Sequence, residues 1–460
     1  MNAVPDAPLA QAQAFLDQHP EITAFQIFMT NFSGVPRGKN IRRHELLPIF
    51  EHGRYLPGTM LVLDITGEDV DETGLVWEDG DADRLGKPIS HTLSPMPWLG
   101  EDMGQLMLSV YELDNRPCRQ DPRHILRAVV ERFAPLGLTP VVACELEFTL
   151  FDQRRDSAGR LQPPLAVSGT HRQRDIQVYG LSELDDLTPF LQDLYAACLR
   201  QDIPAETAIS EYAPGQMEIT LRHRADALRA ADDAVRYKRT VKGIAQRHGM
   251  IATFMAKPAS LQAGNGMHLH ASLADRNGNA FASEDAAGTP LLRHAIGGMM
   301  RLLPDSMAIF APNANSYRRF QAKSYAPVAP NWGINNRTVS LRVPAGPAAS
   351  RHIEHRMSGA DANPYLALAA MLAGMHYGIT HEIDPGTPVS GNGYAQAENS
   401  GSRLPTNWVA AVEAFTASAP MQEYLGEDNV RIYGAIKHTE QQRFLGQVTE
   451  LDYDWYLRNA

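Results

Sequence analysis

The sequence predicts a two-domain protein of the α+β class, and three observations support that prediction. The first 115 or so residues mix short strand-like runs, at 24–29 and 60–63, with turns rich in Gly and Pro. The pattern changes at 121–122, where Asp followed by Pro begins a helical spacing of apolar residues. Four later segments alternate apolar with polar or charged side chains, as amphipathic strands do. We therefore expect a small, mostly β domain over 1–115 and a larger domain over 116–460.

Helices are expected mainly in the larger domain. The first follows Asp121 and carries Ile125, Leu126, Val129 and Val130 at the spacing of one helix face. Further helices are predicted at 184–201, 225–248 and 364–379, the last apolar on nearly every side, and loops rich in Gly, Pro, Ser and Asn at 155–180, 276–290 and 385–405.

Composition excludes several classes of protein. The 460 residues include 42 Lys and Arg against 53 Asp and Glu, a net charge of −11, and no stretch gathers the basic residues into a face for nucleic acid. Three cysteines, Cys118, Cys144 and Cys198, are far apart, which fits a reduced cytosol. The N-terminus lacks the features of a secretion leader, and the longest apolar stretch, 366–375, is too short to cross a bilayer. We expect a cytoplasmic protein with no nucleic-acid or membrane partner.

The segment 141–150 places two carboxylates on one face of a predicted strand. Period two sends Leu146 and Phe148 to one side and leaves Glu145 and Glu147 on the other. Three later segments repeat this layout with other polar residues. Their polar sides carry Glu218, with Glu211 across a Pro-Gly turn, then His268, His270 and Ser272, and finally Arg342.

These polar faces together predict a metal site. Taken singly, each is more often the solvent-exposed face of a sheet. Solvent-exposed faces, however, usually carry Lys, Thr, Ser and Gln rather than clustered metal ligands. Oxygen-rich ligands with few imidazoles favour Mg²⁺ or Mn²⁺ over Zn²⁺. Magnesium beside arginine indicates phosphoryl transfer, and no P-loop or kinase signature is present. A binuclear amidohydrolase is disfavoured, because His268 and His270 lie past the middle of the chain.

The motifs and their order resemble the glutamine synthetase family over nearly the whole chain. The matching segments are ExEF at 145–148, GQ-x-E at 215–218, GMHxH at 266–270, NSYxR at 315–319, NR…xRxP at 336–344 and IExR at 353–356.

The resemblance implies an N-terminal β-grasp domain, a catalytic domain with an antiparallel strand barrel flanked by helices, and a dodecamer of two stacked hexameric rings. It implies a two-step reaction in which the γ-carboxylate of glutamate attacks the γ-phosphate of ATP and an amine then displaces phosphate. The implied roles are metal binding by Glu147, Glu211 and Glu218 and by Glu145, His268 and Glu354; ATP binding by His270 and Ser272; catalytic contact with its phosphates by Arg337 and Arg342; and glutamate binding by Gly264, Arg319 and Arg356.

The sequence departs from ammonia-using members of the family at the acceptor site. Their flap carries a Glu a few residues after NSYxR, whereas Tyr325 stands in the corresponding run 323–328. Their DGSS-like loop has no counterpart at 50–70, no adenylylation segment is found near 390–405, and Ala263 stands where the family has Asn. These departures resemble the γ-glutamylpolyamine synthetase branch, because an aromatic wall suits a substituted amine with a second ammonium.

Four functions remain open at this stage. We expect a ligase that joins glutamate to putrescine, spermidine or spermine in polyamine catabolism. The alternatives are a γ-glutamylmonoamine or ethanolamine synthetase, an authentic glutamine synthetase, and a catalytically silent regulatory or structural homologue. In the first of these functions Tyr325 binds the substrate. The alternative for this residue is that its side chain only fills space.

Overall fold

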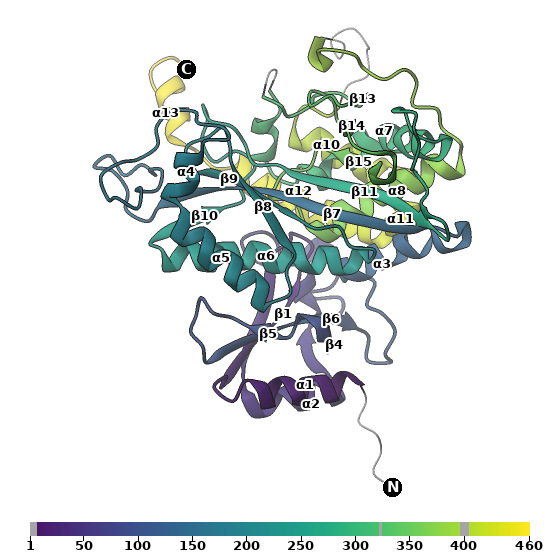
Figure 1. The fold of residues 1–460 in the computed structure, drawn as a ribbon. Coiled ribbons are helices and arrows are strands. Elements are labelled where there is room, and N and C mark those ends of the chain that lie inside the picture. The colour runs from purple at the N-terminus through teal and green to yellow at the C-terminus, as the bar shows by residue number, and fades with distance from the viewer. Residues whose placement is uncertain (1–6, 322–323, 396–403) are drawn as a thin grey trace.

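The computed structural model describes residues 7–321, 324–395 and 404–460, and its strands form two separate sheets (Figure 1). The first sheet has the order β2-β1-β6-β4-β3, with β5 on β6. β1 and β6 are parallel and the other pairs are antiparallel. The elements are α1 (Ala7–Gln18), β1 (Ala24–Thr30), β2 (Pro36–Arg42), α2 (Leu46–His52), β3 (Arg54–Pro57), β4 (Asp83–Pro88), β5 (Ser94–Pro95) and β6 (Met103–Tyr111).

Two features of this N-terminal region differ from the prediction. The run 60–63 is not a strand, since Gly58–Leu61 forms a 3-10 turn whose Thr59 side chain donates to Asp81 at 2.7 Å. A short buried apolar run fits a helical turn as well as a strand, so periodicity alone cannot separate them. The sequence also gave no signal for α1 or α2. The first sheet lies within residues 24–111, and a domain boundary near 115 stays a prediction.

The second sheet has nine strands in the order β13-β14-β15-β11-β7-β9-β8, with β10 on β7 and β12 on β11. All pairs are antiparallel except β13 with β14. The four predicted polar-faced strands are β7, β9, β11 and β14, which confirms the α+β class. The bounds are β7 (Thr139–Asp152), β8 (Ala205–Ser210), β9 (Gln216–Leu221), β10 (Met250–Thr253), β11 (Met267–Asp275), β12 (Gly278–Asn279), β13 (Trp332–Ile334), β14 (Leu341–Val343) and β15 (Ile353–His355).

The helices pack around this sheet. The predicted cap is confirmed, because the Asp121 carboxylate accepts from the backbone N–H of Arg123. The prediction at 184–201 corresponds to two helices, and those at 225–248 and 364–379 are confirmed by α6 and α8. Helix α7 and helices α10 to α13 were not predicted, and part of the predicted loop 385–405 lies outside the described residues. The bounds are α3 (Pro122–Glu131), α4 (Leu181–Asp186), α5 (Thr188–Arg200), α6 (Ala227–Arg247), α7 (Pro290–Phe310), α8 (Pro364–Thr380), α10 (Trp408–Ala417), α11 (Ala419–Leu425), α12 (Glu427–Leu445) and α13 (Glu450–Tyr456).

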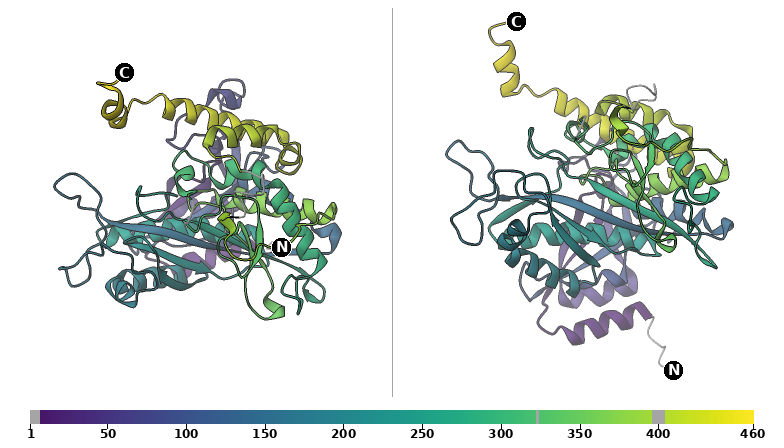
Figure 2. Two further views of the ribbon diagram at one scale, coloured as in Figure 1. Left: turned by 90° about the horizontal axis from the view of Figure 1, so that it is seen from above. Right: turned by 45° about the horizontal axis from the view of Figure 1, so that its top comes forward.

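The core decides which face of the second sheet carries the polar residues. Helices α5 and α6 lie between that sheet and the N-terminal sheet, whereas α13 projects away from the body (Figures 1 and 2). Phe148 of β7 contacts Phe190 of α5 with ring centroids 6.3 Å apart. Cys144, Leu146 and Phe148 are fully buried, so the alternate residues Glu145 and Glu147 point away from the helices. Among the described helices, none is both long and apolar enough to span a bilayer.

Candidate active site

A row of charged side chains crosses five strands of the second sheet. Strand register produces it, because residues directly opposite one another on antiparallel strands share a face. We call this set the charged row; its register pairs are Glu147 with Glu218, Glu145 with His268, His270 with Glu354, and Arg342 with Glu354.

The two histidines of β11 contact the carboxylates of the neighbouring strands. His268 Nδ1 lies 2.6 Å from an oxygen of Glu145 and 3.8 Å from an oxygen of Glu354. His270 Nε2 lies 3.5 Å from the other Glu145 oxygen. Both imidazoles therefore connect the middle of the charged row to its β15 end.

Arginine neutralises the charged row at its β15 end. Arg342 donates to Glu354 at 2.8 Å, and Arg356 donates to the other oxygen of the same carboxylate. Burial works to raise the pKa of Glu354, but the charge of Arg356, followed by that of His268, lowers this pKa to about 2. Glu354 is therefore a carboxylate at neutral pH although it is only 2% exposed.

The opposite end, formed by β7 and β9, has an excess of carboxylates. Burial, and then the charge of Glu147, raises the pKa of Glu211 to about 8. Burial and the charges of Glu145 and Glu147 raise the pKa of Glu218 to about 11. Glu147 itself accepts hydrogen bonds from the backbone of Gly266 at 2.8 Å and from Gln216 at 3.1 Å. Such a set of acids needs protons or a cation to lie together.

A divalent cation fits this donor set. Glu145, Glu218 and His268 offer ligand atoms within 4.8 Å of one another, and so do Glu145, His270 and Glu354. These groups share five of the predicted metal and ATP ligands but divide them differently from the prediction, which joined Glu218 to Glu147 and Glu211. The raised pKa of Glu218 reflects the excess of negative charge around it, which a bound cation would offset.

The acid-rich end of the charged row opens into a cavity of about 550 Å³. Most predicted site residues line this cavity, whereas His270, Ser272, Arg342 and Glu354 lie along the strands beyond its wall. Ser272 is placed two residues after His270 on β11, and no described side chain hydrogen-bonds to it. The predicted residues in the wall are Glu145, Glu147, Glu211, Glu218, Gly264, His268, Arg319, Tyr325, Arg337 and Arg356.

The predicted glutamate-binding residues are held by tight packing. Arg319 donates to the backbone oxygens of Met357 at 2.9 Å and Arg356 at 3.2 Å, and it is only 5% exposed. A Cβ at position 264 would lie 2.3 Å from the backbone oxygen of Ala256, so only Gly fits there.

Tyr325 forms an aromatic wall of the cavity together with Tyr212. Their ring centroids lie 5.7 Å apart with an interplanar angle of 34°. Tyr325 has a φ of +58°, and 47% of it is exposed. Lys323, which begins the same predicted flap run, lies outside the described residues.

Two residues of this site, Gln216 and Tyr212, were not predicted from the sequence. Gln216 donates to both Glu147 and the backbone oxygen of Gly264, so it joins a metal-ligand strand to the glycine loop. Its place inside the GQ-x-E motif was the available signal. Tyr212 had no such signal, because its partner Tyr325 is distant in the sequence.

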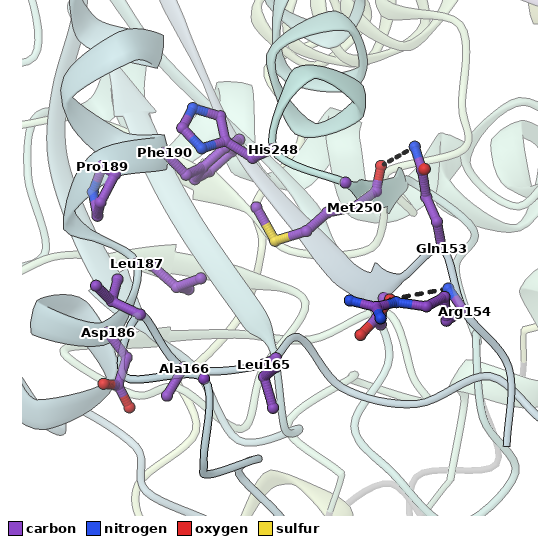
Figure 3. Close-up of a pocket in the computed structure, with 14 residues that line it drawn as sticks. Gln153, Arg154, Leu165, Ala166, Asp186, Leu187, Pro189, Phe190, His248 and Met250 are labelled. Carbon is purple, nitrogen blue, oxygen red and sulfur yellow. Dashed lines mark hydrogen bonds and ion pairs between the residues drawn. The ribbon is translucent and has the colours of Figure 1, made fainter.

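A second cavity, of about 410 Å³, lies beside β10 and contains none of the predicted residues (Figure 3). Two of its polar groups are paired with residues outside the cavity: His248 contacts Asp193 at 2.9 Å, and Asp152 binds Arg172 at 2.5 Å. We therefore place the chemistry of the chain in the first cavity.

Comparison with known proteins agrees with this geometry. The family described as glutamine synthetase, catalytic domain, matches residues 119–456. Gamma-glutamylputrescine synthetase of Escherichia coli K12 is 39% identical over 98% of this chain and 95% of its own length. Glutamate–isopropylamine ligase of a Pseudomonas species is 30% identical over 98% of both chains. A solved structure of GmaS in complex with ADP superimposes with a TM-score of 0.83 at 26% identity, covering 99% of this chain and 100% of that one.

The fold and the charged row define an enzyme of the class of ATP-dependent ligases that form carbon–nitrogen bonds. Within that class, the chain belongs to the glutamine synthetase family. The glutamine synthetase-like fold predicted from the six motifs is thereby confirmed.

Proposed function

We propose that the enzyme joins the γ-carboxylate of L-glutamate to a polyamine such as putrescine, spermidine or spermine, through a γ-glutamyl phosphate. The observation that carries the proposal is the 39% identity to gamma-glutamylputrescine synthetase over nearly the whole of both chains. The aromatic pair Tyr212 and Tyr325 supports it, since aromatic faces attract organic ammonium groups. A cytoplasmic dodecamer is part of the same proposal.

The residues have separate tasks in this reaction. Glu147, Glu211 and Glu218 on one side, and Glu145, His268 and Glu354 on the other, would hold Mg²⁺ or Mn²⁺. The bound ion would supply positive charge that offsets the negative charge developing during phosphoryl transfer.

The remaining side chains position the substrates. Arg337 and Arg342 would contact the phosphates of ATP, with His270 and Ser272 beside the nucleotide. Gly264, Arg319 and Arg356 would orient glutamate, so that its γ-carboxylate attacks the γ-phosphate in line. Attack by the amine then breaks the acyl–oxygen bond and releases phosphate. Both steps depend on positioned charge rather than on a covalent enzyme intermediate.

A monoamine acceptor is the second candidate. It is favoured by the 30% identity to glutamate–isopropylamine ligase and by the 31% identity to gamma-glutamylethanolamide synthetase of Streptomyces coelicolor. Tyr325 would then cover a carbon chain without contacting a second ammonium.

The test measures phosphate release from ATP in the presence of glutamate, Mg²⁺ and one amine at a time. The panel contains ammonium, ethanolamine, an alkylamine, putrescine, spermidine and spermine. Selective turnover with the di- and polyamines is expected. Preference for a singly charged amine would replace the proposal with the second candidate, and turnover with ammonium alone would identify an authentic glutamine synthetase. Silence with every amine would favour a non-catalytic homologue.

A further inference from the structure

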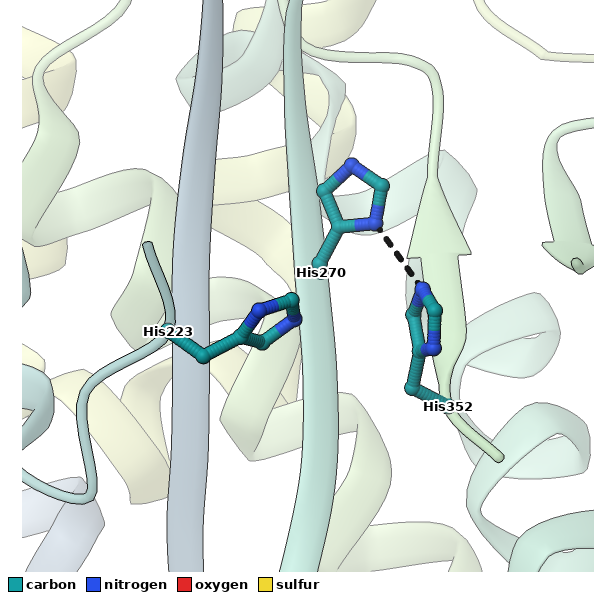
Figure 4. Close-up of side chains that lie close together, drawn as sticks. All are labelled: His223, His270 and His352. Carbon is teal, nitrogen blue, oxygen red and sulfur yellow. Dashed lines mark hydrogen bonds between the residues drawn. The ribbon is translucent and has the colours of Figure 1, made fainter. Parts of the chain in front are cut away.

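Three histidines meet on the second sheet beside the charged row (Figure 4). His270 belongs to β11, His352 directly precedes β15, and His223 follows β9. Their ring nitrogens include one from each residue, all within 4.8 Å of one another. The ring centroids are 5.3 Å apart for His270 and His352, 5.6 Å for His223 and His352, and 6.0 Å for His223 and His270.

The hydrogen bond from His352 Nδ1 leaves the lone pair of Nε2 directed at His270. His352 Nδ1 lies 2.7 Å from the backbone oxygen of Ser350. A carbonyl oxygen only accepts, so Nδ1 carries the proton and Nε2 has a free lone pair. That lone pair faces His270 Nδ1 at 3.2 Å. A backbone carbonyl on the far nitrogen is the usual support for a metal-binding histidine.

His270 has the other usual support, a carboxylate. Its Nε2 lies 3.5 Å from Glu145, which places a proton on Nε2. In the metal-free protein its Nδ1 shares a hydrogen bond with His352 Nε2 at 3.2 Å. A cation bound by both nitrogens would displace the proton between them. Two imidazoles on one tetrahedral Zn²⁺ have nitrogens about 3.3 Å apart, given Zn–N bonds of about 2.0 Å.

His223 supplies the third ligand. Figure 4 shows its ring beside those of the other two histidines, and among the described residues no side chain or backbone group hydrogen-bonds to its ring. Three imidazoles without a carboxylate suit Zn²⁺ and its neighbours in the transition series, whereas Mg²⁺ prefers oxygen. A fourth position stays open to water or to a substrate oxygen.

We propose that His223, His270 and His352 bind a divalent transition ion of the Zn²⁺ class, next to the carboxylate-rich site. The bound ion holds His270 away from the nucleotide and thereby inhibits the ligase. The inhibitory part rests on the proposed function, because it needs His270 to contact ATP. The binding part rests on the three imidazoles alone.

Binding is tested by titrating the full chain with Zn²⁺ in an excess of Mg²⁺, followed by calorimetry. Wild type should bind Zn²⁺ at this site, and His223→Gln and His352→Gln should each lower the affinity at least about tenfold. His52→Gln is the matched control, because its side chain is 78% exposed and far from the cluster in sequence. Equal affinity in wild type and both cluster variants would overturn the site.

Co²⁺ provides an independent readout. At a three-histidine site it should adopt four-coordinate geometry with intense visible absorption, and that absorption should disappear in His223→Gln and His352→Gln. A weak spectrum that both variants share with wild type contradicts the proposal.

Inhibition is measured separately by ATP turnover with the preferred amine. Zn²⁺ should inhibit wild type at least about tenfold more strongly than His223→Gln. Binding without inhibition would overturn only the regulatory part. If no amine supports turnover, the proposed function fails, while the calorimetric and spectroscopic results still decide the site.

Discussion

Glu354 and Glu218 lie near opposite ends of the charged row, and the pKa of Glu354 is lowered whereas that of Glu218 is raised. Glu354 is buried and Glu218 is half-buried, and loss of solvent works to raise the pKa of each carboxyl. Beside Glu354, the charge of Arg356 overcomes burial and lowers the pKa to about 2. Beside Glu218, the charges of Glu145 and Glu147 add to burial and bring the pKa to about 11. Neighbouring charge, rather than burial, therefore decides at which end of the charged row the carboxylates are electrostatically balanced without a metal.

Neutralising one carboxyl at a time should distinguish the two ends of the charged row most clearly. Glu354→Gln leaves Arg342 and Arg356 without their buried partner and should destabilise the metal-free protein by about 3–5 kcal/mol. Glu218→Gln should change the metal-free stability by less than about 0.5 kcal/mol, since Glu218 is already protonated at neutral pH. Both should abolish turnover. Chemical unfolding in a chelator provides the measurement, and equal destabilisation by the two variants would refute the comparison.

The pH dependence of stability should reveal the acid-rich end. Glu211, with a pKa of about 8, binds a proton in the native metal-free protein that the unfolded chain has released above about pH 4.5. The native state then holds more protons, so stability should fall as pH rises from about 5 to 8, by up to about 1.4 kcal/mol per pH unit for each such group.

Magnesium should reverse this trend. The ion displaces the protons from Glu211 and Glu218, so its affinity should rise with pH over the same interval. Calorimetry in two buffers of different ionisation enthalpy detects the released protons. Metal binding without proton release at pH 7 would contradict the raised pKa values.

A smaller effect is expected from the hydrogen bond that supports Glu147. Gln216→Ala removes the donor to Glu147 and to the backbone oxygen of Gly264, and should weaken Mg²⁺ binding about tenfold. Gln153→Ala, which removes an exposed amide far from the charged row, is the control. Unchanged Mg²⁺ affinity in Gln216→Ala would show that Glu147 needs no support.

The smallest effect is expected on the choice of amine substrate, through Tyr325 in the wall of the cavity. Tyr325→Glu adds another carboxylate there and removes an aromatic face worth about 0.5–1 kcal/mol to an ammonium group. The ratio of polyamine to ammonium turnover should fall several-fold, while Tyr325→Phe should retain it. An unaltered amine profile in Tyr325→Glu would mean that Tyr325 only fills space.

Local patterns predicted most of the charged row. Alternation along each strand placed Glu145 and Glu147 on one face, because successive side chains of a strand point to opposite sides. Such patterns carry no information on Asp64, which stands in an acidic segment of the sequence. In the structure Asp64 is fully buried, accepts from the Thr66 hydroxyl at 2.7 Å and pairs with Arg443 of α12 at 2.5 Å. No local signal reports a partner so far along the chain.

Local sequence patterns are sufficient to identify the side chains that face the site and, through the order of the motifs, the family. The balance of charge among these side chains follows from the folded chain. Strand register brings Arg342 and Glu354 together but leaves Glu218 opposite Glu147, and electrostatic energy depends on such distances between residues remote in sequence. Likewise, His223, His270 and His352 come together from the segment after β9, from β11 and from the residue before β15. The sequence shows which side chains are present, whereas the fold determines which charges surround each of them.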